Sequence, residues 1–320
     1  MKARLRAAVG LVAGNVQRPD ITIAHRFRKP PYGGSNQFLL ALASELRRNG
    51  LRVGENVGFA GTRGVIINSF LFDEQRLAAI ARAGARVLHR VDGPVSVYRG
   101  VDDGTDGRVV DVNRRYADVT VFQSRYSLEK SQAIGIELVS PVVISNAVDP
   151  TIFHPPTVAS EPQEVVRIIA TSWSDHPNKG ADLYAWLDEQ LDRSRYSLTF
   201  VGRLPRALRH ATMVPPVGSD GVAELLRSHD IYLTASKHEA CSNALVEALA
   251  CGLPTVYVDS GSNPELVGAA GVAFNGEDDV LAAIDLVAAD LQGYRSAIAL
   301  PSLAETAARY LDALGIAGRS

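Results

Sequence analysis

The sequence predicts an α/β protein built from two doubly wound parallel sheets that face each other across a cleft. Three observations support this prediction. Short β-branched segments alternate with helical segments from about residue 21 to residue 145, the alternation stops in a proline-rich stretch, and it restarts near Val165. Strands that alternate with helices form parallel sheets, because each helix carries the chain back across the sheet. A chain of 320 residues, 46% of them hydrophobic, is long enough for two cores.

The first half of the chain shows the alternation from its start. Residues 21–27 are expected to form a strand, a loop with Gly33 and Gly34 follows, and an amphipathic helix over 37–49 ends at Gly50. Further strands are expected at 65–69, 86–91, 119–123 and 142–145, with helices near 74–83, 108–117 and 126–134.

The domain boundary is expected between Asn146 and Glu164, where four prolines stand in a stretch without hydrophobic periodicity. We therefore predict one domain over residues 1–150 and a second over 151–301, with the last segment, about 302–320, packing back on the first. Expected in the second half are strands at 165–170, 197–201, 231–234 and 255–258, helices at 180–191, 222–227 and 244–250, and an alanine-rich helical tail over 278–314.

The overall charge gives no sign of a nucleic-acid partner. Lys and Arg number 33 and Asp and Glu 35, for a net charge of −2. The segment Met1–Arg52 differs, with ten basic residues against two acidic ones. Such an excess suits an anionic acceptor or peripheral contact with a membrane surface, and it equally suits solvated charges on helix faces.

The two cysteines and the hydropathy favour a cytoplasmic protein. Cys241 and Cys251 are expected on one helix, where ten residues correspond to about 15 Å, too far for a disulfide. Free cysteines are typical of a reducing compartment. The apolar patch over 7–14 lacks a convincing cleavage site, so we expect no signal peptide. No run approaches the length of a membrane span.

One carboxylate stands in an otherwise apolar helix. Glu247 is the only charged residue between Glu239 and Asp259, and the helix around it is expected to begin near Ser242 or Asn243. Burial of an ionised carboxylate without partners costs several kcal/mol or more. Glu247 is therefore expected either to be protonated or to meet hydrogen-bond donors, which a ligand can supply.

Other polar residues fall where ligands bind in doubly wound sheets, at the carboxyl ends of the strands. Lys179 follows a strand, and the cation suits a phosphate there, although a solvated lysine is an equal alternative. His89, near the end of a strand, is either a catalyst or a structural histidine. Glu239 and Glu247 lie eight positions apart, about 12 Å along one helix, which suits two ends of an extended ligand better than a catalytic pair. The helix entrance between them offers free amides to a phosphate.

Four motifs together resemble family 4 glycosyltransferases, which have the two-Rossmann GT-B fold. These are Glu239 and Glu247 separated by seven residues and followed by A-L-A-C-G-L-P-T-V, the preceding D-I-Y-L-T-A-S, the linker V-I-S-N-A-V-D-P-T-I-F-H-P, and G-G-S before a helix. The resemblance covers about residues 21–274. It implies retaining transfer of a sugar from a nucleotide-sugar donor, such as a UDP- or GDP-sugar, without an obligatory metal or other cofactor.

The resemblance also implies roles for single residues. Glu247 would hold the ribose hydroxyls and Glu239 the donor sugar, and His89 would face the transferred sugar from the first, acceptor-side domain. The diphosphate would be bound by Lys179 and by the amides of Ser242, Asn243 and Ala244. Gly33 and Gly34 would approach the donor phosphate or the acceptor. The family usually has an arginine shortly before this lysine. Here T-S-W-S-D-H-P-N-K-G contains none, and Arg203 is the expected substitute.

Three functions are compatible with these residues. The first is an active glycosyltransferase whose acceptor is a glycan, a lipid-linked glycan, a cell-envelope precursor or a small molecule. The second is a catalytically silent relative that binds a sugar nucleotide or a glycan. The third is a sugar-nucleotide epimerase of the same fold. Turnover with or without an acceptor distinguishes them.

Overall fold

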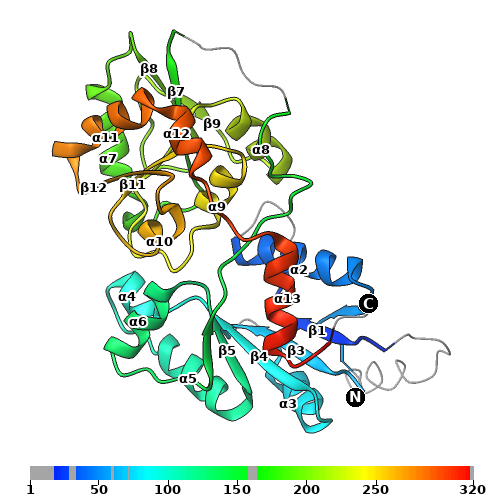
Figure 1. The fold of residues 1–320 in the computed structure, drawn as a ribbon. Helices are drawn as coiled ribbons and strands as arrows, with labels where there is room; N and C mark the ends of the chain where they lie inside the picture. Colours follow the sequence, from blue (N-terminus) through cyan, green and yellow to red (C-terminus); the bar gives the residue numbers. More distant parts are fainter. Residues whose placement is uncertain (1–17, 29–33, 59–60, 71, 158–163, 318–320) are drawn as a thin grey trace.

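The computed structural model describes residues 18–28, 34–58, 61–70, 72–157 and 164–317. Within these residues the chain forms two six-stranded sheets, one above the other in Figure 1, and every strand pair is parallel. Helices alternate with the strands in both halves. The predicted pair of doubly wound sheets is confirmed.

The first sheet has the order β2-β1-β3-β4-β5-β6. Its strands are β1 (Ile21–Ala24), β2 (Val53–Glu55), β3 (Gly64–Asn68), β4 (Arg86–Val91), β5 (Val119–Phe122) and β6 (Pro141–Val143). The helices of this half are α2 (Gly34–Arg48), α3 (Glu74–Arg82), α4 (Val95–Arg99), α5 (Thr105–Tyr116) and α6 (Arg125–Ala133).

The second sheet has the order β12-β11-β10-β7-β8-β9. Its strands are β7 (Val166–Ser172), β8 (Tyr196–Gly202), β9 (Thr212–Val214), β10 (Ile231–Thr234), β11 (Thr255–Val258) and β12 (Gly271–Phe274). The associated helices are α7 (Ala181–Gln190), α8 (Ser219–Arg227), α9 (Asn243–Ala250), α10 (Asn263–Val267), α11 (Glu277–Ala289) and α12 (Leu291–Ser296), with a short 3₁₀ turn, η1, at Pro177–Lys179.

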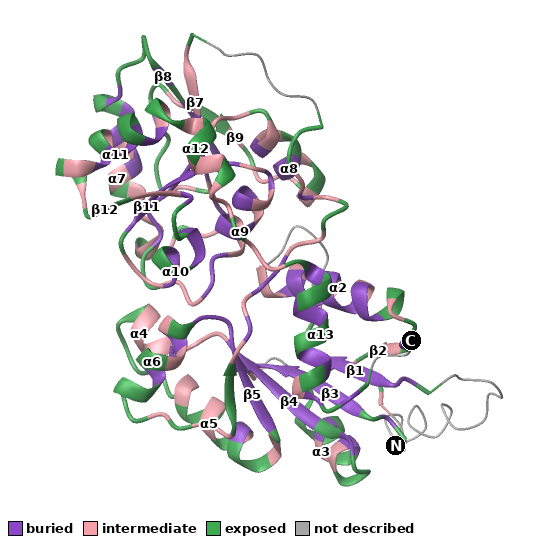
Figure 2. Cartoon of the chain, viewed as in Figure 1, coloured by how far each residue is buried: buried purple, intermediate pink, exposed green. Residues whose placement is uncertain are grey.

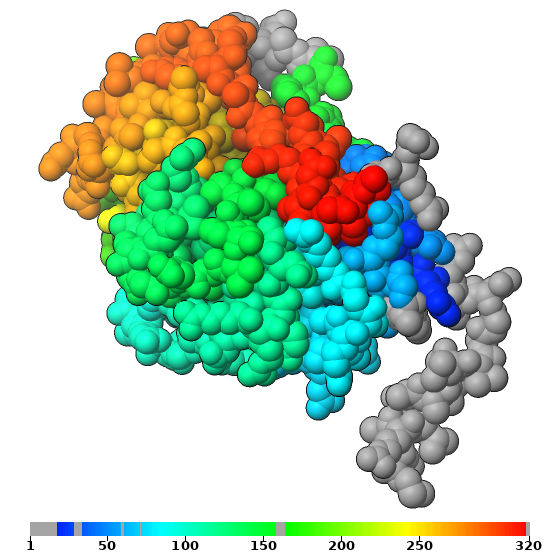
Figure 3. All heavy atoms as spheres, turned by 60° about the horizontal axis from the view of Figure 1, so that its bottom comes forward, coloured from blue at the N-terminus to red at the C-terminus, as the bar shows by residue number. Residues whose placement is uncertain are grey.

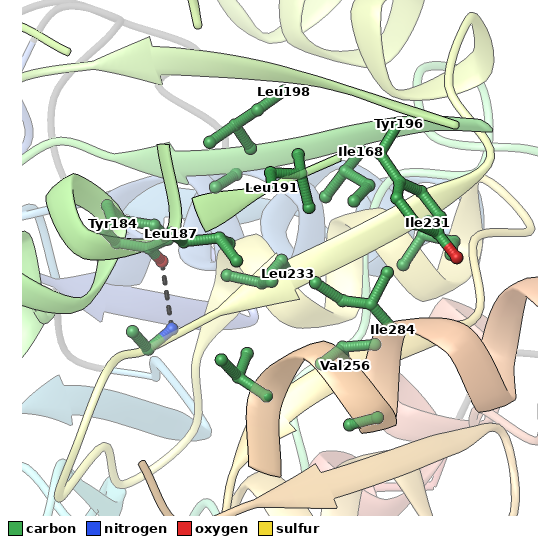
Figure 4. Packing of buried hydrophobic residues seen from close by; sticks show 14 of the residues in the cluster. Ile168, Tyr184, Leu187, Leu191, Tyr196, Leu198, Ile231, Leu233, Val256 and Ile284 are labelled. Atoms are coloured by element: carbon green, nitrogen blue, oxygen red, sulfur yellow. Dashed lines mark hydrogen bonds between the residues drawn. The ribbon is translucent and has the colours of Figure 1, made fainter. Parts of the chain in front are cut away.

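The central strands are buried along almost all of their length because helices cover both faces of each sheet. Figure 2 shows β1, β3, β4 and β5 buried along their length, and the same holds for β10 and β11. Such strands lack the alternation of polar and apolar residues that a half-exposed strand shows. In the core of the second sheet, drawn in Figure 4, the buried Tyr184 accepts a hydrogen bond from the backbone nitrogen of Ala235 at 3.0 Å.

The last helix crosses back to the first half. Helix α13 (Leu303–Ala313) packs against α2, and Ala307, Tyr310 and Leu311 belong to the same buried cluster as Ile21 and Phe38. Figure 3 shows this C-terminal segment, in red, against the blue and cyan residues of the first half. The chain therefore passes between the two halves twice, once after β6 and once before α13.

Two sequence expectations need comment here. Cys241 lies before α9 and Cys251 at its C-cap, so they are not both inside one helix, and both are buried and free. In the described part of the chain, no helix is long and apolar enough to cross a membrane.

Candidate functional site

A cavity of about 400 Å³ lies between the two halves and is lined by residues of both. The lining follows the ends of four strands. Asp92 comes directly after β4, Gln123 after β5, Trp173 after β7, and Ser236 shortly after β10. The carboxyl edges of both sheets thus open into one space, which is where ligands bind in doubly wound folds.

Two helices begin at this cavity. Gly34 is the first residue of α2 and Asn243 the first of α9, and both line the cavity. A Cβ at Gly34 would lie 2.1 Å from Nδ2 of Asn243, so only glycine permits this approach. Ser242 caps α9 by accepting a hydrogen bond from the Leu245 nitrogen at 3.4 Å. The remaining free amides at the two helix starts, with the helix dipoles, favour an anion between them.

Glu247 extends from α9 into the cavity. Burial raises its pKa to about 8, and among the described residues no hydrogen-bond or ion-pair partner meets its carboxyl group. The nearby Tyr232 hydroxyl bonds instead with Oγ1 of Thr171 at 3.0 Å. As expected from the sequence, the fold buries the carboxyl group of Glu247 without a partner, which disfavours its charged form. A ligand with hydroxyl donors would supply the missing hydrogen bonds.

Lys179 and Glu239 form an ion pair at the cavity wall. Lys179 ends η1, Glu239 lies in the loop after β10, and Nζ is 2.5 Å from Oε1. Burial alone lowers the pKa of Lys179, but the Glu239 carboxylate and Tyr98 together outweigh burial and raise the pKa. Gly261, at φ +66°, makes room for this loop, because a Cβ there would meet the Glu239 backbone at 2.7 Å.

Asp92 supplies a third carboxylate, from the other side of the cavity. It accepts hydrogen bonds from Arg90 Nη1 at 2.9 Å, Ser69 Oγ at 3.2 Å, Ser35 Oγ at 3.4 Å and the Gln123 side-chain amide. Burial by itself raises the pKa of Asp92, but Arg90 and these hydrogen bonds together lower it. Asp92 is therefore ionised at neutral pH and held in a fixed orientation.

His89 lies away from the cavity. It is fully buried in β4 and does not line the cavity, its Nε2 is 2.7 Å from the Ser69 carbonyl oxygen, and its Nδ1 is 3.1 Å from Nδ2 of Asn113. Burial lowers its pKa to about 4. Both ring nitrogens are used inside the domain, so the expected contact between His89 and a transferred sugar does not fit this geometry.

The remaining predicted residues divide into two groups. Glu239, Glu247, Lys179, Ser242 and Ala244 line the cavity, as do Gly34 and Asn243. Arg203 does not line it, and its backbone nitrogen bonds to the Ser172 carbonyl oxygen at 2.8 Å, so the structure places no substitute for the missing arginine there. Gly33 lies outside the described residues.

Contacts between the two halves surround the cavity and were not foreseen from the sequence. Glu265 of α10 accepts hydrogen bonds from the backbone nitrogens of Arg125, at 2.9 Å, and Tyr126, at 3.2 Å, at the start of α6. Tyr98 stacks on His176 with ring centroids 4.9 Å apart. These contacts hold α6 of the first half against α10 of the second, and α4 against the loop before η1.

Asn146 connects the two halves from inside. It is buried, accepts a hydrogen bond from Arg90 Nη2 at 3.0 Å, and donates through Nδ2 to Asn243 at 2.9 Å and to Gln123 at 3.1 Å. The side chain thus connects the Asp92 network to the first residue of α9.

Residues 167–290, which form most of the second half, match the family model described as glycosyl transferases group 1. This part of the chain is therefore similar to glycosyl transferases group 1. No curated protein matches the chain. Similar solved structures include sucrose-phosphate synthase from Thermosynechococcus elongatus, with a TM-score of 0.68, 15% identity, and coverage of 94% of this chain and 95% of that one.

Two more structures have the same two-sheet architecture. The catalytic domain of starch synthase IV from Arabidopsis thaliana, bound to ADP and acarbose, has a TM-score of 0.69 and 10% identity over 92% of this chain and 98% of that one. Anabaena HepE in complex with UDP and glucose has a TM-score of 0.67 and 15% identity over 93% of this chain and 99% of that one. The chain thus has the GT-B fold.

Proposed function

We propose that the protein is a retaining glycosyltransferase that moves a sugar from a nucleotide-sugar donor to a hydroxyl acceptor. The observation that supports this most strongly is the set of groups that line one cavity. The unpaired carboxyl group of Glu247, the amides at the start of α9, and the Lys179–Glu239 pair all line it. A nucleotide sugar presents hydroxyls, a diphosphate and a sugar, which are the groups that such a lining can bind.

Each group matches one part of such a donor. Glu247 accepts hydrogen bonds from the ribose hydroxyls, which supply the donors that its buried carboxyl group lacks. The amides of Ser242, Asn243 and Ala244 and the ammonium of Lys179 face the diphosphate, with Gly34 allowing α2 to approach it. Glu239 accepts from hydroxyls of the donor sugar.

The same arrangement favours the chemical step. As the bond between the sugar C1 and the diphosphate oxygen breaks, negative charge grows on the diphosphate. Fixed amides and Lys179 stabilise this charge more in the transition state than in the ground state. Neutralisation by these groups gives a route that needs no metal ion.

The donor is proposed to be a UDP- or GDP-sugar. A UDP-sugar receives support from the HepE structures, which contain UDP, UDP-glucose, or UDP and glucose. The acceptor is proposed to enter from the side of the first half, where Asp92, Tyr98 and Tyr126 line the cavity.

The test begins with melting temperatures of the purified protein in UDP-glucose, UDP-N-acetylglucosamine and GDP-mannose, because a ligand that binds only the native state raises the melting temperature. Transfer or hydrolysis of the best donor is then measured for the wild type, Glu247→Gln and Lys179→Ala, with Glu305→Gln on α13 as a surface control. Loss of turnover in the first two variants, with folding retained, is expected. The anomeric configuration of the product, determined by NMR, distinguishes retention from inversion. No stabilisation by any donor at millimolar concentration would refute the donor site.

A further inference from the structure

Asp92 is the one carboxylate that the described residues of the first half contribute to the cavity lining. It follows β4 directly, and its side chain is 41% exposed, whereas its partner Arg90 is completely buried. The carboxylate thus sits at the boundary between a sealed polar network and the open cavity. Glu239 and Lys179 line the same cavity from the other half.

The network behind Asp92 fixes its position. Arg90 donates to Asp92 at 2.9 Å, to Asn68 at 2.5 Å and to Asn146 at 3.0 Å, and its guanidinium lies 5.0 Å from the ring centroid of Phe38. A guanidinium with this many partners cannot follow a moving carboxylate. The oxygen atoms of Asp92 are therefore held in place before any substrate arrives, which is the condition for electrostatic stabilisation of a transition state.

A structural ion pair alone explains this arrangement incompletely. A buried arginine needs a partner, because a buried charge left unpaired is strongly destabilising, but that pairing does not require the carboxylate to face a ligand cavity. Here the arginine is inside and the carboxylate faces the cavity. The arrangement directs a fixed negative charge toward whatever occupies that space.

We infer that Asp92 contacts the transferred sugar and stabilises the positive charge that develops on it; this inference rests on the proposed transfer reaction. In that reaction the bond from C1 to the diphosphate oxygen breaks and its electron pair leaves with the diphosphate. The acceptor oxygen forms the new bond to C1, and its proton passes to an oxygen of the departing diphosphate. The sugar ring carries positive charge between these events, and Asp92 faces it.

Asp92 is not the base in this scheme. A general base works best with a pKa near the working pH. Arg90 and the hydrogen bonds around Asp92 lower the pKa of its carboxyl group, which makes it a weak proton acceptor and a permanent anion. Asp92 contributes a negative charge at a fixed position. Its effect on the reaction therefore requires the carboxylate and does not change with pH near neutrality.

The experiment compares Asp92→Asn with the wild type in hydrolysis of whichever of UDP-glucose, UDP-N-acetylglucosamine and GDP-mannose binds best. Water is then the acceptor, so no acceptor needs to be known. Removal of one preorganised electrostatic group lowers kcat by about 100- to 1,000-fold. We expect a loss of this order, with affinity for the free nucleoside diphosphate within about threefold of the wild type. Asp118→Asn, which loses a carboxylate that bonds to Val87 outside the cavity, is expected to keep its kcat.

A second variant separates a charge effect from a folding effect. Asp92→Ala leaves space beside Arg90 that formate can occupy, and formate is expected to restore part of kcat in this variant while leaving the wild type unchanged. The inference is overturned if Asp92→Asn keeps kcat within threefold, or if its loss of kcat is matched by loss of diphosphate affinity and of melting temperature. Failure of the wild type to bind or hydrolyse any donor would refute the proposed function itself, and this assignment with it.

Discussion

The Nζ atom of Lys179 lies 2.5 Å from Oε1 of Glu239, so the cation proposed for the diphosphate and the carboxylate proposed for the sugar are bonded to each other in the free protein. The two side chains are 20% and 17% exposed. A donor that uses both must separate them, and the cost of separation is subtracted from its affinity.

Glu239→Gln is therefore expected to tighten binding of a free nucleoside diphosphate. The variant releases Lys179 from its ion pair. A hydrogen bond to a charged group contributes about 1.5–3 kcal/mol. Every 1.4 kcal/mol, roughly, corresponds to a tenfold change in affinity. Calorimetry with UDP and GDP measures this change in affinity. We expect tighter binding of the diphosphate and a smaller advantage of the complete nucleotide sugar over it.

Lys179→Met provides the opposite control, because it removes the cation and keeps an unbranched side chain. It is expected to weaken diphosphate binding. If Glu239→Gln weakened diphosphate binding as strongly as Lys179→Met does, Glu239 would be supporting the lysine instead of competing for it.

The stability of the free protein should carry a pH dependence from Glu247. Its pKa is about 8 in the folded state, above the ordinary value of 4.5, because burial disfavours the charged form. Between these values the folded state holds a proton that the unfolded state has released. Glu247 therefore reduces the free energy of unfolding progressively as pH rises from about 4.5 to about 8.

Glu247→Gln removes this effect, so the variant is expected to gain stability relative to the wild type over that pH range. Urea unfolding at pH 5, 6, 7 and 8 measures the difference. Glu305→Gln is a control without this pH dependence, because Ser302 lowers the pKa of Glu305 through the capping box of α13 and the carboxylate is ionised in both states between pH 5 and 8. A difference in the free energy of unfolding between Glu247→Gln and the wild type that does not vary with pH would contradict the assignment of a protonated carboxyl group.

The two-sheet fold could be predicted because its long elements carry strong local signals. Apolar segments such as 65–69 and 86–91, separated by amphipathic helices, indicate a parallel sheet without any knowledge of contacts. The short strands β2 and β9 have three residues each and no such pattern. They form because their backbones hydrogen-bond to the edges of the neighbouring strands β1 and β8.

The second-half side of the cavity could also be predicted, because Glu247 is conspicuous in an apolar helix. The first-half side could not. His89 and Asp92 are three residues apart, and β4 is buried on both faces, so its sequence has no alternation to show which side chains point where. Glu265 and Arg125 are 140 residues apart, and nothing local marks their contact.

Glu265 is expected to hold the two halves together. It accepts hydrogen bonds from the first amides of α6, which is the task of an N-cap residue, but it does so from the other half of the molecule. Loss of a helix cap costs about 1 kcal/mol, or about fivefold in an equilibrium constant. Glu265→Ala should lower the ratio of molecules with the two halves closed together to molecules with them apart by about this factor.

Small-angle X-ray scattering and donor affinity together measure the change. We expect a larger radius of gyration and weaker donor binding for Glu265→Ala. Glu305→Ala also removes a helix-capping carboxylate, but from α13 and its own Ser302, so it should lower stability without changing the radius of gyration. Equal radii for the two variants would show that the Glu265 contact does not control closure.

His89 should behave as a structural residue with an acid-sensitive contribution. Burial lowers its pKa from 6.5 to about 4, so in the folded protein the ring stays neutral over a range where the unfolded chain takes up a proton. The neutral ring therefore stabilises the fold fully above pH 6.5 and progressively less as pH falls toward 4. Its hydrogen bonds to Ser69 and Asn113 fix which nitrogen carries the proton.

His89→Gln is expected to lower the free energy of unfolding by about 1–3 kcal/mol at pH 7, because it disturbs the two buried hydrogen bonds of the imidazole ring. The cost should shrink between pH 6.5 and pH 4, as the wild type loses the contribution that the variant lacks. Urea unfolding across this range measures both effects, and UDP affinity of the folded variant should match the wild type. A variant as stable as the wild type at every pH, yet unable to hydrolyse donor, would instead place the imidazole in contact with the sugar, which the hydrogen bonds on both ring nitrogens oppose.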